Sequence, residues 1–369
     1  MNTSLPTDPR SSQASLAKST LPLQFAGLLL LTVLTGWGFS PHRHLHAVAW
    51  THLPQDMKEA WGGSPERLVR WATQADARKH LDSLEGARHY LDLDDLDTLF
   101  TSHGKPAVWG MSWGTYKQSI FEIDSLTSPR THGVLPWQLE WSYRRLVKAM
   151  ASNDSTTCEL DNVIRAAADL GHYLADAHVP LHTSGNSDGQ RSGQRGIHAL
   201  WETQAVEAQL HTRTCPCLHL KSFEAVEGMP YDPVWTPWDI LKDSHALVED
   251  VFQAEREWQD MVANNGWRMR TRGRTLAMLP SLQALAAWDS LTNGHTWPRF
   301  CTTADHIAKA WHAAWMEAGQ PHMAASTESD IGLPPWLLYL QRRWKRGNVA
   351  GQDLQHKSNH ATSSLHLDP

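Results

Sequence analysis

The chain has few cysteines, and this scarcity excludes one class of protein at once. Its 369 residues include four cysteines, far fewer than a disulfide-stabilised scaffold needs. We expect one or two ordinary structural disulfides among Cys158, Cys215, Cys217 and Cys301. The closely spaced Cys215 and Cys217 leave a redox pair or an incidental metal site open, although no strand–helix–strand pattern of the thioredoxin kind surrounds them.

The chain also lacks an excess of positive charge. Its 33 Lys and Arg stand against 39 Asp and Glu, which gives a net charge of −6. This balance argues against broad electrostatic binding to duplex nucleic acid. It remains compatible with a small site in which metal ions supply the positive charge.

Convincing strand patterns, internal repeats and glycine-rich phosphate loops are missing as well. Apolar residues instead recur at helical spacing, which predicts an all-α fold, a bundle of several helices. Residues 101–133 are rich in Gly, Ser, Thr and Pro and predict an irregular excursion, and the acidic run Asp92–Asp97 predicts a solvated turn or cap. The expected helices are His42–Leu53, Pro54–Trp61, Ser64–Ala75, Pro136–Met150, Leu160–Val179, His198–Leu210, Pro237–Val262, Pro280–Leu291 and Thr303–Ala318.

The first 36 residues predict a targeting segment. A polar leader with Arg10 and Lys18 precedes the apolar run Leu21–Leu34, which has the length of a signal-peptide core and is short for a bilayer span. Gly36 is a small residue suited to the position before a cut. We therefore expect an exported protein whose domain covers residues 37–330, with an uncleaved anchor or a misplaced start as alternatives.

Residues 331–369 predict a basic and low-complexity tail. In Leu333–Arg346 an apolar stretch leads into four basic residues. A final helix that closes the core and has a solvated basic end is the favoured interpretation. Contact with an anionic membrane surface is the alternative.

The segment from His172 to Glu202 carries the strongest chemical signal. Each of its two helical pairs, His172 with Asp176 and His198 with Glu202, is four residues apart and therefore shares one helix face. His182 follows Pro180, which disfavours continuation of the first helix. Imidazole and carboxylate are the donors that zinc prefers, so the segment predicts a metal site between two helices.

Chance has to be weighed against this interpretation, because the chain contains 22 histidines. A lone His-x-x-x-Asp is more often a surface pair than a ligand pair. Two such pairs with a histidine between them are much harder to obtain by accident. The intervening residues Thr183–Gly196 include no hydrophobic side chain and predict a mobile loop.

Upstream residues extend the segment into an ordered series. Trp37-Gly38 is followed by His42, Asp76 and His89, the last in the sequence RHYLD. In the order of these residues, the chain resembles the superfamily of zinc-dependent phospholipases C and single-strand-specific zinc nucleases. The local sequences GHYLADAHVPLHT and GIHALWE resemble especially its bacterial phospholipase C-like members. The resemblance covers residues 37–207, about half of the chain. The ordered set is specific, whereas any one of its positions alone is not.

The resemblance implies a cluster of three zinc ions between helices. The first ion would be held by Asp76, His89, His172 and Asp176. The second would be held by the amine and carbonyl of a mature N-terminus at Trp37, by His42 and by a bridging Asp176. The third would be held by His182, His198 and Glu202.

Other interpretations exist for single positions of this set. His46 lies four residues after His42 and is a rival ligand. Taken in isolation, Asp76 would be a helix N-cap, His89 a core histidine and Trp37 a packing residue. The match to the whole series favours the ligand roles.

The resemblance further implies hydrolysis of a phosphodiester by attack of a metal-bound hydroxide on phosphorus. Asp76 could in addition orient the attacking water or take its proton. Glu202 as the last ligand, and Gly193-Gln194 in a long loop, favour the phospholipase branch. A lipid-binding sandwich domain is not evident after residue 210, which weakens that preference.

The expected partner is accordingly a phospholipid or a small phosphoester, with no obligate protein partner evident. Single-stranded nucleic acid or a nucleotide is the alternative, and the 19 tryptophans could provide the stacking platforms it needs. A non-catalytic zinc-binding surface protein is a third interpretation. It is disfavoured because none of the ligand positions is missing.

Overall fold

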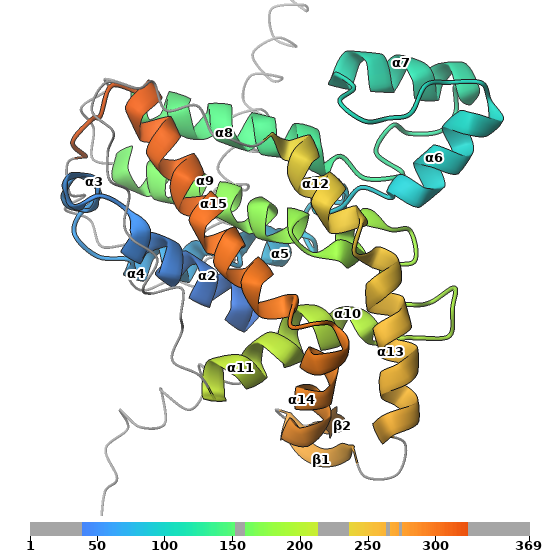
Figure 1. Cartoon of the computed structure of the whole chain (residues 1–369). Coiled ribbons are helices and arrows are strands. Elements are labelled where there is room, and N and C mark those ends of the chain that lie inside the picture. The colour runs from blue at the N-terminus through green and yellow to red at the C-terminus, as the bar shows by residue number, and fades with distance from the viewer. Residues whose placement is uncertain (1–38, 152–158, 213–235, 263–265, 273–274, 324–369) are drawn as a thin grey trace, which may run out of the picture.

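The computed structural model describes residues 39–151, 159–212, 236–262, 266–272 and 275–323. The prediction of an all-α fold is confirmed, since helices dominate the described part (Figure 1). The α-helices are α2 (Phe39–His52), α3 (Gln55–Ala60), α4 (Glu66–Trp71), α5 (Gln74–Arg78), α6 (Leu93–Ser102), α7 (Trp113–Ile123), α8 (Leu135–Ala151), α9 (Glu159–Ala177), α10 (Ile197–Ala199), α11 (Val206–Thr212), α12 (Pro237–His245), α13 (Val248–Val262), α14 (Leu282–Leu291) and α15 (Thr296–Glu317).

Shorter turns complete the helical part. Two 3-10 turns cover Gly86–Arg88 and Pro180–Thr183. A π-helical turn over Leu200–Ala205 joins α10 to α11. The last two turns carry His182 and Glu202, two of the predicted ligands.

Helix α9 forms the centre of the bundle. It packs against α8, α4, α15 and α2 (Figure 1). Three consecutive alanines, Ala166–Ala168, are buried and allow these neighbours to approach closely. Because α9 is covered on several sides, His172 and Asp176 near its C-terminal end lie inside the protein rather than on its surface.

A second, smaller hydrophobic core lies beside this bundle. It joins the π-helical turn to α13 and α14, with Trp201, Trp258 and Trp288 buried against one another. The main core likewise contains fully buried tryptophans, among them Trp61 and Trp137. Most of the described tryptophans therefore serve packing.

Several expected elements differ from the observed ones. Residues 101–133 are not wholly irregular, because α7 begins within them, where the Ser112 side chain accepts a hydrogen bond from the backbone N–H of Thr115. The acidic run Asp92–Asp97 was expected as a solvated turn or a cap; it provides the N-cap, Asp92, and the first turns of α6.

The expected long helix Pro237–Val262 is two helices, α12 and α13. It breaks after His245, where the Thr183 hydroxyl contacts the imidazole and the Ser244 hydroxyl donates to the carbonyl of Ala177. These tertiary contacts end α12 although no Gly or Pro interrupts the apolar pattern. Helix α15 begins at Thr296, seven residues before the expected start, and tolerates Pro298 in its first turn.

The structure also contains one β-hairpin that the sequence analysis missed. Strands β1 (Trp267–Arg272) and β2 (Thr275–Pro280) pair antiparallel next to α14. The alternating run WRMRTR was the available signal, but it is short and stands alone.

Several sequence predictions lie outside the described residues. They are the targeting segment, Trp37, the tail with Leu333–Arg346, and Cys158, Cys215 and Cys217. Cys301 is disulfide-bonded, in line with the expectation of structural disulfides. Among the described helices, none combines the length and the apolar character that crossing a bilayer requires.

Candidate metal centre

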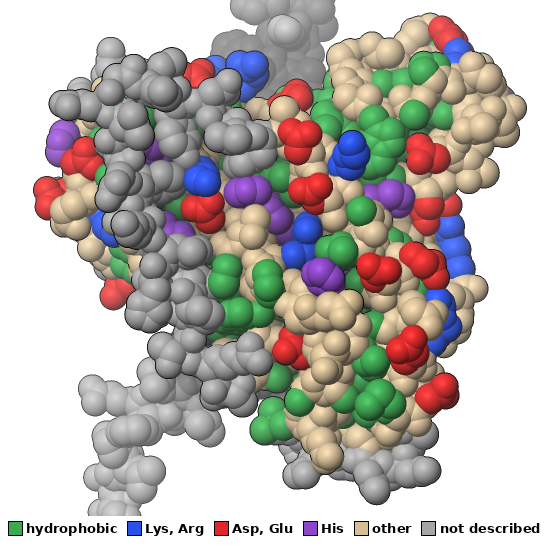
Figure 2. Space-filling view, in the orientation of Figure 1, with side chains coloured by type: hydrophobic (Ala, Val, Ile, Leu, Met, Phe, Trp, Pro, Cys, Tyr) green, Lys and Arg blue, Asp and Glu red, His purple; other side chains and the backbone are tan. Residues whose placement is uncertain are grey.

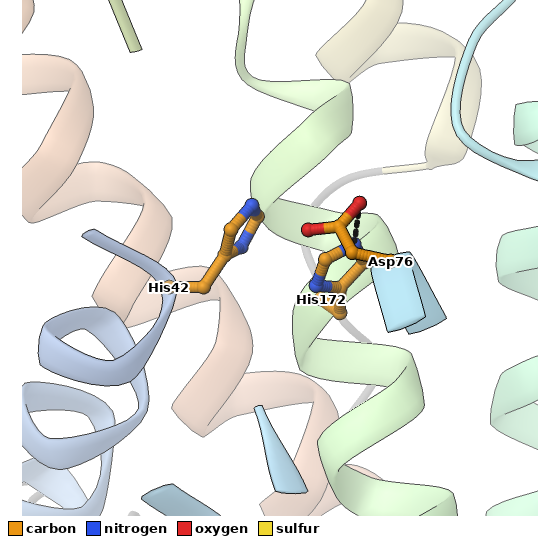
Figure 3. A group of neighbouring side chains, drawn as sticks. All are labelled: His42, Asp76 and His172. Carbon is orange, nitrogen blue, oxygen red and sulfur yellow. Dashed lines mark ion pairs between the residues drawn. The ribbon is translucent and has the colours of Figure 1, made fainter. Parts of the chain in front are cut away.

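The structure brings eight of the nine predicted ligands together; the ninth, Trp37, lies outside the described residues. They come from segments far apart in the chain. Figure 3 shows three of them, His42 from α2, Asp76 from α5 and His172 from α9, facing one space between their helices. The others are His89, Asp176, His182, His198 and Glu202.

The first group surrounds His172. Its Nε2 lies 3.6 Å from Oδ1 of Asp76 and 3.4 Å from Oδ2 of Asp176. The Nδ1 of His89 lies 2.7 Å from Asp176 Oδ2 and 3.2 Å from His172 Nε2. The donor atoms of His89, His172 and Asp176 all lie within 4.8 Å of one another, so they could hold one ion.

A second group surrounds Glu202. Its Oε2 lies 2.8 Å from Nε2 of His198 and 3.8 Å from Nε2 of His182. Its other oxygen lies 3.1 Å from His42 Nε2, which in turn is 3.6 Å from Asp176 Oδ1. Asp176 and His42 therefore connect the two groups into one continuous cluster.

Backbone carbonyls orient three of the imidazoles. Nδ1 of His172 donates to the carbonyl of Ala72 at 2.9 Å, and Nδ1 of His198 donates to that of Ser187 at 3.1 Å. His182 makes the same contact with the carbonyl of His89 at 2.5 Å. Each of these rings consequently presents Nε2 to the cluster, which is how metal-binding histidines are normally fixed.

The buried carboxylates of the cluster are held ionised. Burial would raise the pKa of Asp176, but His172 and neighbouring imidazoles hold that pKa below its usual range. Burial would likewise raise the pKa of Glu202, whereas the neighbouring imidazoles of His182, His198 and His42 hold that pKa well below its usual range. Burial would lower the pKa of His172, yet Asp176 and Asp76 raise it to about 9. The cluster thus favours positive charge, which protons or metal ions can supply.

The donor set fits divalent metal ions. Three carboxylates and five imidazoles converge, and imidazole with carboxylate is a set that binds transition metals. Nε2 of His182 is buried and has no hydrogen-bond partner among the described residues, although it faces Glu202. A metal ion would satisfy this atom.

The rival ligand His46 does not join the cluster. Its two ring nitrogens face the backbone carbonyls of His42 and Ala168 at 2.7 and 3.1 Å. It also belongs to none of the groups that could hold an ion. The structure therefore agrees with the choice of His42, and His46 serves packing between α2 and α9.

The loop Thr183–Gly196 is not free, contrary to the expected mobile loop. Ser184 Oγ and Gly185 N–H donate to the carboxylate of Asp94 at 2.7 and 2.8 Å. Arg191 makes two contacts with the Asp95 carboxylate at 2.6 and 2.7 Å. The acidic run at the start of α6 thus anchors the polar loop.

An open cavity of about 460 Å³ reaches the cluster. Its lining includes His89, His182 and His198 together with Lys79. Nζ of Lys79 lies 2.8 Å from Oδ1 of Asp76, so a fixed cation sits beside the most exposed of the three carboxylates. The sequence analysis missed Lys79, whose only signal was its position three residues after Asp76.

One face of the molecule is mixed in charge. Figure 2 shows His side chains close to acidic and basic ones over the middle of the face in view. A further acidic group, formed by Asp92, Asp95 and His132, could also hold a cation by distance alone. Because Arg191 already engages both oxygens of Asp95, that group has a cationic partner in place.

Gly171 is required by the packing behind the cluster. A Cβ atom there would lie 2.7 Å from Nε2 of His46 and 3.1 Å from the Trp311 ring. We expect Gly171→Ala to destabilise the protein by about 1–3 kcal/mol, although Ala ordinarily favours a helix. Gly114→Ala in α7, where a Cβ meets only Ser112 at 3.8 Å, is the control and should be neutral or stabilising. Urea unfolding of both variants checks this, and equal stabilities would contradict it.

The raised pKa of the Asp92 carboxyl should make the stability of the protein depend measurably on pH. Burial, Asp95 and Asp94 raise the pKa of its carboxyl to about 7, so the folded protein keeps a proton that the unfolded chain releases near pH 4. The contribution of the Asp92 carboxyl to the free energy of unfolding is therefore fully present below about pH 4 and is lost as the pH rises to about 7. Because the carboxyl is partly exposed, we expect Asp92→Asn to gain no more than about 1–2 kcal/mol at pH 8.

Thermal melts between pH 5 and pH 8 test this prediction. The gain of Asp92→Asn over the wild type should grow with pH. Asp94→Asn should instead lose stability, since Asp94 accepts hydrogen bonds from Ser184 and Gly185. A pH-independent difference for Asp92→Asn would contradict the assignment.

Comparison with protein-family models and with curated proteins found no match for this chain. The assignment to a superfamily therefore stays a proposal that depends on the ligand series and on the geometry described above.

Proposed function

We propose that this protein is a zinc-dependent phosphodiester hydrolase. The observation that carries the proposal is the continuous cluster of imidazoles and carboxylates beside a cavity, in the order of ligands that resembles the zinc phospholipase C and nuclease superfamily. Three zinc ions would occupy it. A degenerate, non-catalytic site is disfavoured because every described ligand position points into the cluster.

Zinc ions bound there would neutralise the charge of a phosphodiester and lower the pKa of bound water from about 15.7 to about 7. The residues of the chain would position the reactants around them. Asp76 has a side chain that is 20% exposed, against 2% for Asp176, so Asp76 is the more accessible of the two to a water molecule. It would orient that water or take its proton, while Lys79 would bind a phosphate oxygen.

Phospholipids are the first candidate substrates, as the last ligand Glu202 and the long polar loop suggest. Single-stranded nucleic acid or nucleotides are the second candidate, favoured by one structural observation. Tyr90 and Asp92 both line the cavity. A ring and a carboxyl group at this place could stack on a base and accept its hydrogen bonds.

Turnover on two substrates distinguishes these candidates. We would assay protein secreted from the full chain on phosphatidylcholine vesicles and on single-stranded DNA, with and without a zinc chelator. Chelator-sensitive headgroup release alone supports the phospholipase, and chelator-sensitive DNA cleavage alone supports the nuclease. Absence of both activities at full zinc occupancy would refute the proposal.

Asp76→Asn tests the proposed additional role of this ligand in the same assay. Loss of turnover with zinc retained supports it, whereas full zinc and full turnover would remove it. The N-terminal sequence of the secreted protein tests whether cleavage exposes Trp37 as a ligand, and with it the proposed export.

A further inference from the structure

The ring of His89 is reversed relative to three other imidazoles of the cluster. His172, His182 and His198 present Nε2 to the cluster and use Nδ1 for a backbone carbonyl. His89 instead presents Nδ1, at 2.7 Å from Asp176 Oδ2. Its Nε2 points away, is buried, and has no hydrogen-bond partner among the described residues.

The carboxylate of Glu85 lies near Nε2 of His89 and could accept a hydrogen bond from it. Oε1 of Glu85 lies 3.6 Å from His89 Nε2, slightly beyond hydrogen-bond length. Glu85 is 0% exposed, so its position near His89 is not an incidental contact of a surface side chain. A shift of a few tenths of an ångström would complete a carboxylate–imidazole hydrogen bond.

Three further side chains hold Glu85 in this place. The Arg78 guanidinium binds both carboxylate oxygens at 3.1 and 3.0 Å, and Tyr173 donates its hydroxyl to Oε1. Arg88 also contacts Oε2. Arg78 is itself fixed by Asp169 at 2.8 Å. The carboxylate therefore has a rigid and charge-compensated setting.

We propose that Glu85 is a positioning residue that turns His89 so that Nδ1 faces the first metal position, and that this sets the affinity of that position. The proposal rests on the metal centre proposed above, but not on the reaction. A carboxylate behind a metal-binding histidine fixes the ring and its tautomer and makes the ligand nitrogen more basic. Nothing comparable stands behind His172, His182 or His198, which face neutral carbonyls.

Zinc titration of Glu85→Gln tests the proposal without any substrate. This variant keeps the size of the side chain and removes its charge. Competition with a chromophoric chelator should show one of the bound zinc ions weakened on the order of 10- to 100-fold, with the remaining ions unchanged. In cobalt-substituted protein, the visible absorption of that position should shift as well.

Glu255→Gln is the matched control. Glu255 is also a buried carboxylate held by side-chain hydrogen bonds, from Gln194 and Gln259, but it lies on α13 and belongs to none of the groups that could hold an ion. Its zinc affinities should equal those of the wild type. A change of less than twofold in Glu85→Gln, or an equal loss in Glu255→Gln, would overturn the proposal.

Tyr173→Phe keeps the test decisive if Glu85→Gln fails to fold. It removes one hydrogen bond to Glu85 and no charge, so the same zinc ion should be weakened several-fold. An unchanged affinity in this folded variant would overturn the proposal. Failure of the wild type to bind metal would overturn it too, whereas three bound ions without turnover would refute only the proposed reaction.

Discussion

Removal of the proposed zinc ions is expected to lower the melting temperature of the protein by about 10 °C or more and to abolish the proposed hydrolytic turnover. The cluster contains two carboxylates, Asp176 and Glu202, whose side chains are only 2% and 13% exposed. Without cations these groups need protonated imidazoles for compensation. An ion present at about 1,000 times its dissociation constant contributes about 4 kcal/mol of stability. With an unfolding entropy of about 2.1 cal/mol/K per residue, each kcal/mol corresponds to somewhat less than about 2 °C in a domain of this size, so two or three such ions together produce the expected shift.

Thermal melts before and after dialysis against a chelator measure this effect. Added zinc should restore both the melting temperature and the turnover, while magnesium should restore neither, because it prefers oxygen ligands in an octahedral arrangement. An unchanged melting temperature after verified removal of all metal would contradict the prediction.

The second large effect is expected for Asp176→Asn. Asp176 belongs to two of the groups that could hold an ion, one with His89 and His172 and one with His42 and Glu202. Replacing its charged carboxylate by an amide should release about two zinc ions. With the ions gone, turnover should fall at least about 1,000-fold.

Metal analysis and turnover of purified variants check this prediction. Asp161→Asn is the control, since Asp161 lies on the same helix and pairs with Arg67 away from the cluster. It should keep all zinc and full activity. An Asp176→Asn protein with the metal content of the wild type would show that Asp176 is not a bridging ligand.

Much of the candidate site was readable from local spacing. The pairs His172–Asp176 and His198–Glu202 each share a helix face because residues four apart do so in any helix. Pro180 indicated the end of α9 for an equally local reason. The resemblance then added His42, Asp76 and His89, which spacing alone could not connect to the segment.

The less predictable parts depend on contacts between remote residues. Gly or Pro normally mark a helix end, but α12 ends at His245 because Thr183 and Ala177 bind its last turn. The loop Thr183–Gly196 is polar and reads as mobile. Its order comes from Asp94 and Asp95, about 90 residues away in the chain.

The sequence by itself determined the all-α class, most of the helices and which histidines and carboxylates share a helix face, because these depend on periodicity and on side-chain chemistry. Only the tertiary structure decided that Lys79 lies beside Asp76 and that Glu85 lies behind His89. It also placed His42, which the resemblance had favoured over His46, at the cluster. Such choices depend on the distances between packed helices. Those distances follow from the packing of α9 among its neighbours, and the spacing of residues within any single segment does not encode them.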